Sequence, residues 1–298
     1  MRELNESKGA GQLSRAIETV AVLGAGAMGH GITQVAAFAG YKVIMRDVDM
    51  SAVARGVSSI EVNLAKGIQL GKLSDEERDN TLQRIRGTSK LEDASEADLF
   101  IEAVPERMEL KQQTLANVEA LSNRDFIFAT NTSSLSISSI ASVSRNPAVV
   151  VGLHFFNPVH LMRLVEIVIG NETSAETVET VRQFALKLRK EPIAVRDVPG
   201  FASSRLGIAL GLEAMRMLEQ NVASAKDIDT AMELGYNHPM GPLKLSDHIG
   251  LDVRLDIAEY LYRELGSETF RPPEILRTLV GEGKVGRKSG EGFYRWND

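Results

Sequence analysis

Residues 17–47 decide the fold, and they read "IETVAVLGAGAMGHGITQVAAFAGYKVIMRD". The run 17–24 has the short, β-rich apolar composition of a buried strand and stops at a glycine. Residues 27–40 have helical periodicity and end at Gly40, a residue type that commonly follows a helix. Residues 41–47 are a second apolar run. A strand, a helix and a strand within about thirty residues predict a βαβ unit with parallel strands.

The turn between the first strand and the helix, "GAGAMG", places Gly24, Gly26 and Gly29 at the spacing G-x-G-x-x-G. Glycines there allow a tight turn, close approach of a pyrophosphate to the backbone, and close contact of helix with strand. Asp47 ends the second strand, where a carboxylate can accept the ribose hydroxyls of an adenosine. These residues predict NAD binding, although the neighbouring Arg46 could accept a 2′-phosphate and leaves NADP open. The alternative interpretation is a glycine-rich turn with a helix-capping aspartate.

Strand-like and helix-like segments continue to alternate along the chain. Strands are expected at 97–104, 124–131, 148–156, 164–170 and 192–197, and helices at 51–71, 74–85 and 174–190. This α/β alternation predicts a Rossmann-type, doubly wound and mostly parallel sheet.

Pro199 and Gly200 end this pattern, and only helical periods follow. We therefore expect a flexible leader over 1–16, an NAD-binding domain over 17–198, and an all-helical substrate-binding and dimerisation domain over 199–298.

Composition excludes several classes of protein. The chain has 298 residues with a formal charge of −6, and its 34 basic residues do not cluster, so nucleic acid is not an expected partner. The absence of cysteine excludes disulfides, thiolate metal sites and a cysteine nucleophile. The five histidines are scattered, and we expect no metal. No apolar run is long enough to cross a membrane and the leader lacks a secretory h-region, so a cytoplasmic location is expected.

Ligands of a doubly wound sheet bind at the carboxyl ends of its strands. The side chains expected at these ends are Glu102, Glu106, Asn131, Ser133, Ser134, His154 and Asn157. For the serines the alternative is capping of the helix that follows, which we expect of Ser134 or Ser136 in any case.

The stretch 152–167, "GLHFFNPVHLMRLVEI", raises a more specific question. Glu166 alternates with apolar residues in a strand, and a buried carboxylate requires a partner. Asn157-Pro158 can turn the chain so that this strand returns beside the preceding one and brings Glu166 near His154. A carboxylate beside an imidazole fixes its tautomer and stabilises the imidazolium, as a general base requires. The alternatives are a core histidine and a solvent-facing glutamate, because alternation alone does not say which row is buried.

Several longer motifs resemble the 3-hydroxyacyl-CoA dehydrogenase family, particularly its bacterial 3-hydroxybutyryl-CoA dehydrogenases. They are "GAGAMG", "NTSSLSI", "GLHFFNPVHLMRLVE", "NHPMGPLKLSDHIGLD" and "GRKSGEGFY", in the family's order from about residue 17 to the C-terminus. The resemblance implies a cytoplasmic homodimer that joins through its helical domain and acts in fatty acid or butanoate metabolism. It also implies NAD-dependent oxidation of the (S)-3-hydroxyl of an acyl-CoA to a ketone, or the reverse reduction.

The resemblance also implies roles for individual residues. His154 matches the family's general base, and Glu166 matches the acid that orients it. Ser133 matches the serine that hydrogen-bonds the substrate oxygen near the nicotinamide. Further positions match contacts to NAD: Met28, Glu106, Lys111, Asn157 and Lys288. Ser59 and Lys66, which share a helical face, match contacts to CoA.

One position departs from the family's pattern. In "PGFASSR", Ser204 stands where the family has an asparagine that helps to bind the substrate oxygen. A hydroxyl can still donate a hydrogen bond, with a shorter reach and one donor instead of two. We expect Ser204, or a water that it holds, to act in place of the asparagine. Two other functions stay open: a dehydrogenase of a free hydroxy or sugar acid, and a non-catalytic protein that senses or binds NAD.

Overall fold

The computed structural model describes residues 16–122 and 124–296, in two compact units that meet in the chain between Asp197 and Val198. The leader expected over 1–16 lies, except for Ala16, outside the described residues. None of the helices in these two ranges is long and apolar enough to cross a membrane.

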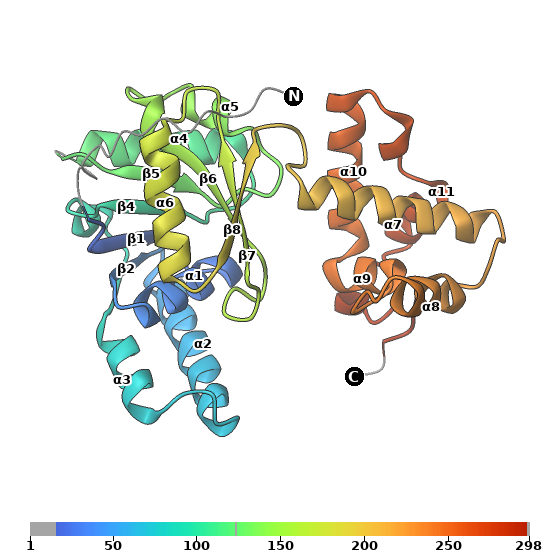
Figure 1. The fold of residues 1–298 in the computed structure, drawn as a ribbon, viewed down its shortest axis with the longest axis horizontal. Coiled ribbons are helices and arrows are strands. Elements are labelled where there is room, and N and C mark those ends of the chain that lie inside the picture. The colour runs from blue at the N-terminus through green and yellow to red at the C-terminus, as the bar shows by residue number, and fades with distance from the viewer. Residues whose placement is uncertain (1–15, 123, 297–298) are drawn as a thin grey trace. The chain divides into compact units, whose positions relative to one another are not determined.

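The first unit contains one eight-stranded sheet (Figure 1). Its strands are β1 (Thr19–Leu23), β2 (Lys42–Arg46), β3 (Ile85–Thr88), β4 (Leu99–Glu102), β5 (Ile127–Thr130), β6 (Val150–Phe155), β7 (Leu164–Ile169) and β8 (Glu191–Arg196). Its α-helices are α1 (Ala27–Phe38), α2 (Met50–Gln69), α3 (Asp75–Gln83), α4 (Met108–Leu121), α5 (Ile137–Ala141) and α6 (Ala175–Lys187). The 3₁₀ turns η1 (Leu91–Ala94) and η2 (Pro147–Val149) complete it.

The order of the strands is β3-β2-β1-β4-β5-β6-β7-β8. Every neighbouring pair is parallel except β6 and β7. The chain leaves β1 toward one edge of the sheet and β4 toward the other. The carboxyl ends of β1 and β4 therefore border the place where a doubly wound sheet holds its ligand. The expected Rossmann-type, mostly parallel sheet is confirmed.

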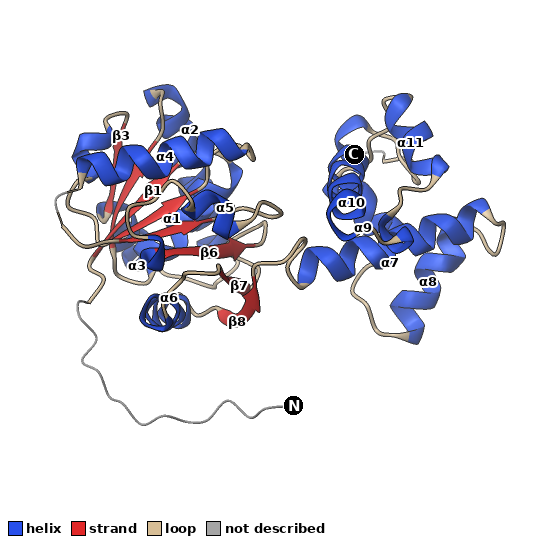
Figure 2. Ribbon diagram, turned by 90° about the horizontal axis from the view of Figure 1, so that it is seen from above, coloured by secondary structure: helices blue, strands red, loops and turns tan. Residues whose placement is uncertain are grey.

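Both faces of the sheet are covered. On one face, alternate residues of the central strands pack with α1 and α6, as the buried set Val22, Ile32, Ile101, Leu153 and Phe184 illustrates. Figure 2 shows α6 on the opposite side of the strands from α4. Ile137 of α5 lies over Gly152, where a Cβ would come within 2.8 Å of its Cδ1. Burial on both faces explains why the strand sequences are apolar without strict alternation.

Two elements of this unit were absent from the sequence-based expectations. The strand β3, "IRGT", is an edge strand that exposes its two central residues, so it lacks an apolar pattern. Half of the residues of helix α4 are apolar, but its buried face is interrupted by Lys111. Periodicity of apolar side chains could reveal neither element.

The second unit is helical, as expected. It consists of α7 (Ser203–Glu219), α8 (Ala225–Gly235), α9 (Pro242–Ile249), α10 (Leu251–Leu265) and α11 (Glu274–Gly281), with the 3₁₀ turns η3 (Glu268–Phe270) and η4 (Arg287–Ser289). Its core is formed by apolar residues of these helices, among them Leu212, Leu243 and Leu261.

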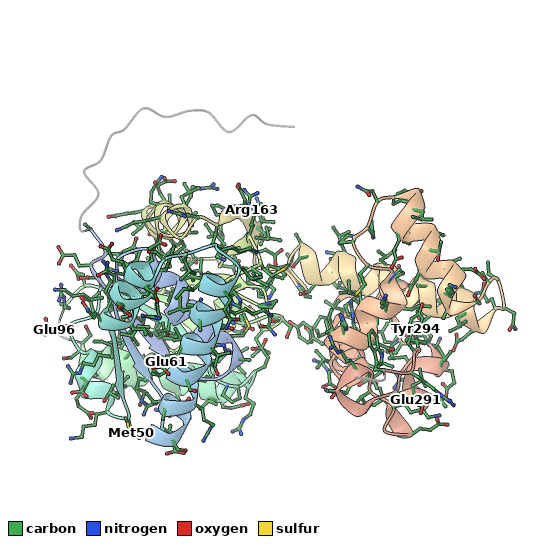
Figure 3. The ribbon with its side chains drawn as sticks, turned by 90° about the horizontal axis from the view of Figure 1, so that it is seen from below. Met50, Glu61, Glu96, Arg163, Glu291 and Tyr294 are labelled. Carbon is green, nitrogen blue, oxygen red and sulfur yellow. The ribbon has the colours of Figure 1, made fainter. Side chains whose placement is uncertain are left out.

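Two buried aspartates tie residues 293–296 to the helices of this unit. Asp247 accepts hydrogen bonds from the backbone N–H of Phe293 and Tyr294 and from Nε1 of Trp296, at 2.9 to 3.0 Å. Asp229 accepts one from the hydroxyl of Tyr294 at 2.6 Å, within the helical unit (Figure 3). The segment "GEGFYRW" therefore serves to complete this unit.

Candidate active site

The glycine-rich turn after β1 has the conformation that its sequence predicts. Gly24 has a φ of +114°, and a Cβ there would come within 2.5 Å of the carbonyl oxygen of Ala103. A Cβ at Gly29 would overlap the carbonyl oxygen of Gly24, so glycine is required where the helix passes the turn. Gly26 differs, because a Cβ there would meet nothing within 4 Å. The open side of the turn is therefore at Gly26, the N-cap of α1.

Asp47 lies beside this turn at the carboxyl end of β2. One carboxylate oxygen accepts from the N–H of Ala25 at 2.8 Å, and the other from the N–H of Val48 at 2.8 Å. Each oxygen keeps a second lone pair that a ribose hydroxyl could use. The cap of the next helix, α2, is a different residue, Asp49. The turn, the free N–H groups at the start of α1 and this carboxylate fit an adenine dinucleotide.

A buried ion pair supports the neighbouring strand end. The carboxylate of Glu102, at the end of β4, is fully buried and accepts from Lys111 Nζ at 2.8 and 3.1 Å. It also accepts from the N–H of Val104 at 2.7 Å and from Thr130 Oγ1 at 2.6 Å. Four hydrogen bonds therefore compensate the burial of this carboxylate. Glu102 was a candidate from the sequence, but its pairing with Lys111 was not foreseen.

Glu106 holds the loop that follows β5. Its Oε1 accepts from Thr132 Oγ1 at 2.6 Å, from the N–H of Ser133 at 2.9 Å and from the N–H of Ser134 at 3.2 Å. Its Oε2 lies 3.2 Å from Lys111 Nζ. Burial acts to raise the pKa of Glu106, but the charge of Lys111 and the bonds from Thr132 and Ser133 outweigh it and hold that pKa below its usual value. An ionised Glu106 therefore fixes the backbone of Ser133.

The far side of the same loop is held by Asp197, which ends the first unit. Its carboxylate accepts from Ser136 Oγ at 2.8 Å and from the N–H groups of Ile137 and Ser138 at 3.0 and 2.7 Å. Ser136 is the N-cap of α5, which confirms the expected capping role. Asp197 and Glu106 thus anchor both ends of residues 132–138. Sequence reasoning missed Asp197, because no spacing connects it with this loop.

His154 and Glu166 occupy directly paired positions of the antiparallel strands β6 and β7. His154 Nδ1 lies 2.8 Å from Glu166 Oε2, and the two side chains are 6% and 0% exposed. The expected return of the strand, and the expected meeting of the two side chains, are both confirmed. Both rows of β7 are buried: Val165 and Ile167 face the core shared with α1 and α6, and Glu166 faces the other side with His154. The imidazole also packs on Phe156, with ring centroids 4.5 Å apart.

Asn131 connects this pair to the loop of Ser133. Its side-chain oxygen accepts the N–H of Phe155 at 2.9 Å, and its own N–H donates to the carbonyl of Glu102 at 2.8 Å. The ends of β4, β5 and β6 are therefore joined by hydrogen bonds. His154, Ser133 and Glu106 belong to adjoining segments at one edge of the sheet.

The remaining predicted site residues are distributed over both units. Met28 lies on α1 and packs partly against the core, Asn157 is exposed after β6, and Lys111 is 1% exposed with its ammonium turned toward two carboxylates. Ser59 and Lys66 lie on α2, where Ser59 Oγ donates to the carbonyl of Arg55 at 2.9 Å. Ser204 and Lys288 are in the helical unit, and Lys288 pairs with Asp252 at 2.6 Å. The roles of these residues stay predictions.

Comparison with known proteins identifies the family. The profile for "3-hydroxyacyl-CoA dehydrogenase, NAD binding domain" matches residues 19–198, and that for the C-terminal domain of the same enzymes matches residues 200–296. The chain belongs to the 3-hydroxyacyl-CoA dehydrogenase family. The first of these matches also confirms NAD as the cofactor of this oxidoreductase.

Relatives within the 3-hydroxyacyl-CoA dehydrogenase family match over nearly the whole chain. A Deinococcus radiodurans protein named "Probable 3-hydroxybutyryl-CoA dehydrogenase" is 43% identical, covering 92% of this chain and 99% of its own length. The 3-hydroxybutyryl-CoA dehydrogenase of Clostridioides difficile is 40% identical, with 93% and 99% covered. The crystal structure of (S)-3-hydroxybutyryl-CoA dehydrogenase PaaH1 from Ralstonia eutropha has a TM-score of 0.92 at 39% identity, covering 95% of this chain and all of that one.

Proposed function

We propose that this chain is an NAD-dependent 3-hydroxybutyryl-CoA dehydrogenase that interconverts (S)-3-hydroxybutyryl-CoA and acetoacetyl-CoA. The single observation that carries the proposal is the buried pair of His154 and Glu166, whose side chains are 2.8 Å apart. His154 lies on β6, which pairs with β5, the strand that leads into the loop of Ser133. The names of the relatives supply the substrate class.

His154 is the general base of this mechanism. With the Nδ1 hydrogen directed to the carboxylate of Glu166, Nε2 is the acceptor that takes the proton of the substrate's 3-hydroxyl. Glu166 stabilises the imidazolium that results, and because it is fully buried its effect is not screened by water. When bound, NAD⁺ supplies the acceptor for the hydride that leaves C3. In the reverse direction His154 returns its proton to the carbonyl oxygen.

Two hydroxyl groups position the substrate oxygen in this proposal. Ser133 donates to it, with the serine's backbone held by Glu106 at 2.9 Å. Ser204 of α7 takes the place of the family's asparagine. Ser133 lies next to both NAD and acyl-CoA, and Ser59 and Lys66 of α2 contact the CoA. Residues 17–198 hold the cofactor in this assignment, and residues 199–298 serve the substrate and the dimer.

The helical unit also carries the proposed dimer contact. Five large apolar side chains are more than a third exposed on three helices that contact one another: Leu206 and Leu210 on α7, Leu245 and Ile249 on α9, and Val253 on α10. Leu245 and Ile249 are four residues apart in α9 and therefore share one face of that helix. An apolar area of this kind is typical of an interface between subunits. We place the homodimer in the cytoplasm.

Steady-state assays test the proposed reaction. We expect NADH-dependent reduction of acetoacetyl-CoA, a much slower reaction with NADPH, and none with free acetoacetate or sugar acids. Turnover of free acids in preference to the thioester would transfer the chain to the alternative class of dehydrogenase. No consumption of NADH with any 3-ketoacyl-CoA would favour a protein that binds NAD without catalysis.

Two variants test the finer assignments. Ser204→Ala should lower kcat/KM for acetoacetyl-CoA, and an unchanged value would remove Ser204 from the site. Leu206→Glu should halve the mass measured by light scattering, and a wild-type chain that is already monomeric would contradict the dimer.

A further inference from the structure

A buried lysine holds the turn between β6 and β7. Lys190 directly precedes β8 and is 6% exposed. Its Nζ donates to the backbone carbonyls of Val159 and Met162, the latter at 2.7 Å, and no carboxylate of the described chain forms an ion pair with it. Burial lowers the pKa of Lys190. The pKa of His160, in the same turn, is lowered by burial and then by the charge of Lys190, so the ammonium is directed at this turn.

The turn, residues 156–163, depends on this ammonium for one of its buried polar groups. Val159 is 1% exposed, and its carbonyl accepts no backbone hydrogen bond from the described residues. The side chain of Val159 packs under α1, where a Cβ at Gly31 would lie 2.9 Å from Val159 Cβ. A buried carbonyl requires a partner, and here the partner is Lys190. The turn is therefore held by α1 on one side and by this lysine on the other.

The same turn sets the register in which His154 and Glu166 face each other. The two residues are directly opposite in the antiparallel ladder of β6 and β7. The turn of a hairpin fixes its register, and a slip of one residue would move Glu166 to the other face of the sheet. The residue after Lys190 ties down the end of the turn as well, because the N–H of Glu191 donates to the carbonyl of Arg163 at 2.8 Å.

We propose that Lys190 is a positioning residue for catalysis. By binding two carbonyls of the turn, it holds Glu166 in the register that directs its carboxylate at Nδ1 of His154. This inference rests on the proposed function, in which that pair supplies the general base. A displacement of about 1 Å in an active site can lower a rate about 10²-fold. Loss of the ammonium should therefore lower kcat, although Lys190 itself touches neither substrate nor cofactor in this proposal.

A matched pair of side chains tests the role of the ammonium. The chain has no cysteine, so Lys190→Cys can be alkylated at a single site in the unfolded protein and then refolded. Alkylation with 2-bromoethylamine restores an ammonium at the length of lysine, and 1-bromopropane gives the same length with a methyl end. The aminoethylated protein should approach the kcat of refolded wild type with acetoacetyl-CoA. The propylated protein should fall about 10- to 100-fold below it, with KM for acetoacetyl-CoA changed less than about threefold.

A spectroscopic measurement separates positioning from stability. The hydrogen between Nδ1 of His154 and Glu166 should give a low-field proton resonance, assigned by its absence from His154→Gln. The resonance should be present in the aminoethylated protein and weakened or shifted in the propylated one, at a temperature where both are folded. Lys190→Met, which needs no refolding, should behave as the propylated protein. Arg163→Met is the control, because it breaks an exposed ion pair with Glu191 on the same turn and should change neither kcat nor the resonance.

Two results would overturn the proposal. Equal kcat in the two alkylated proteins would show that the length of the side chain matters and its hydrogen bonds do not. A lower melting temperature of Lys190→Met, with kcat and the resonance of His154 unchanged, would leave the lysine a purely structural role. If wild type fails to reduce acetoacetyl-CoA, the proposed function is wrong, and the resonance still decides whether Lys190 positions Glu166.

Discussion

Replacing Lys111 by methionine tests whether the buried charges of Lys111 and Glu102, next to the loop of residues 132–138, compensate each other. The change keeps the length of the side chain and removes its charge. It leaves the fully buried carboxylate of Glu102 without its cation, and Glu106 without its nearest one. Breaking a buried ion pair from one side costs about 3–5 kcal/mol. At roughly 2–4 °C per kcal/mol for a unit of this size, the melting temperature should fall by about 6–20 °C.

A double variant is the matched control for this measurement. Glu102→Gln together with Lys111→Met removes both buried charges, and the amide oxygen can still accept the N–H of Val104. Calorimetry should therefore find much of the lost stability restored in the double variant. If Lys111→Met costs less than about 1 kcal/mol, or if the double variant is no more stable than the single one, the two charges do not compensate each other as argued.

Three further changes have defined outcomes. Gly26→Ala should leave the melting temperature unchanged, because the new Cβ meets nothing within 4 Å. It should nevertheless weaken NAD binding at least tenfold in a calorimetric titration, because the Cβ would stand where the pyrophosphate approaches the turn. Equal affinity would mean that no phosphate approaches the turn there. The pKa of Glu106 is lowered, so the stability that its carboxylate contributes is present above the ordinary value of 4.5 and is lost as pH falls through the lowered pKa. Urea unfolding between pH 3 and 7 should therefore show a difference in stability between wild type and Glu106→Gln that shrinks at the acid end. A difference that stays constant with pH would contradict this. Asp197→Ala removes three hydrogen bonds at the start of α5 and should destabilise the first unit by about 1–2 kcal/mol in urea, whereas no change would show that the loop does not depend on it.

The sequence contains most of the fold, because the strands at the centre of the sheet carry a clear physical pattern. The βαβ unit was predictable from an apolar run, a glycine turn and a second apolar run. The antiparallel return of β7 was predictable from Asn157-Pro158 and from the need of Glu166 for a partner. In contrast, β3 is a half-exposed edge strand, and its segment "IRGT" differs little from a loop in composition.

The site was predictable only in part. His154 and Glu166 are close enough in sequence for one strand turn to bring them together. Asp197 lies about sixty residues beyond the loop that it holds, and only the completed sheet brings them together. Arg254 of α10 likewise packs against Gly207 and Gly211 of α7 only because the two helices meet, and no periodicity of the sequence predicts this contact.

The central claim is that the imidazole of His154 removes the substrate proton while Glu166 holds its tautomer. Its most direct test is to measure kcat and NAD affinity for His154→Gln, with acetoacetyl-CoA as substrate. We predict a fall in kcat of about 10² to 10⁴-fold with little change in NAD affinity, the usual effect of losing a general base. A variant that retains its kcat, or that loses cofactor binding to the same degree, would contradict it.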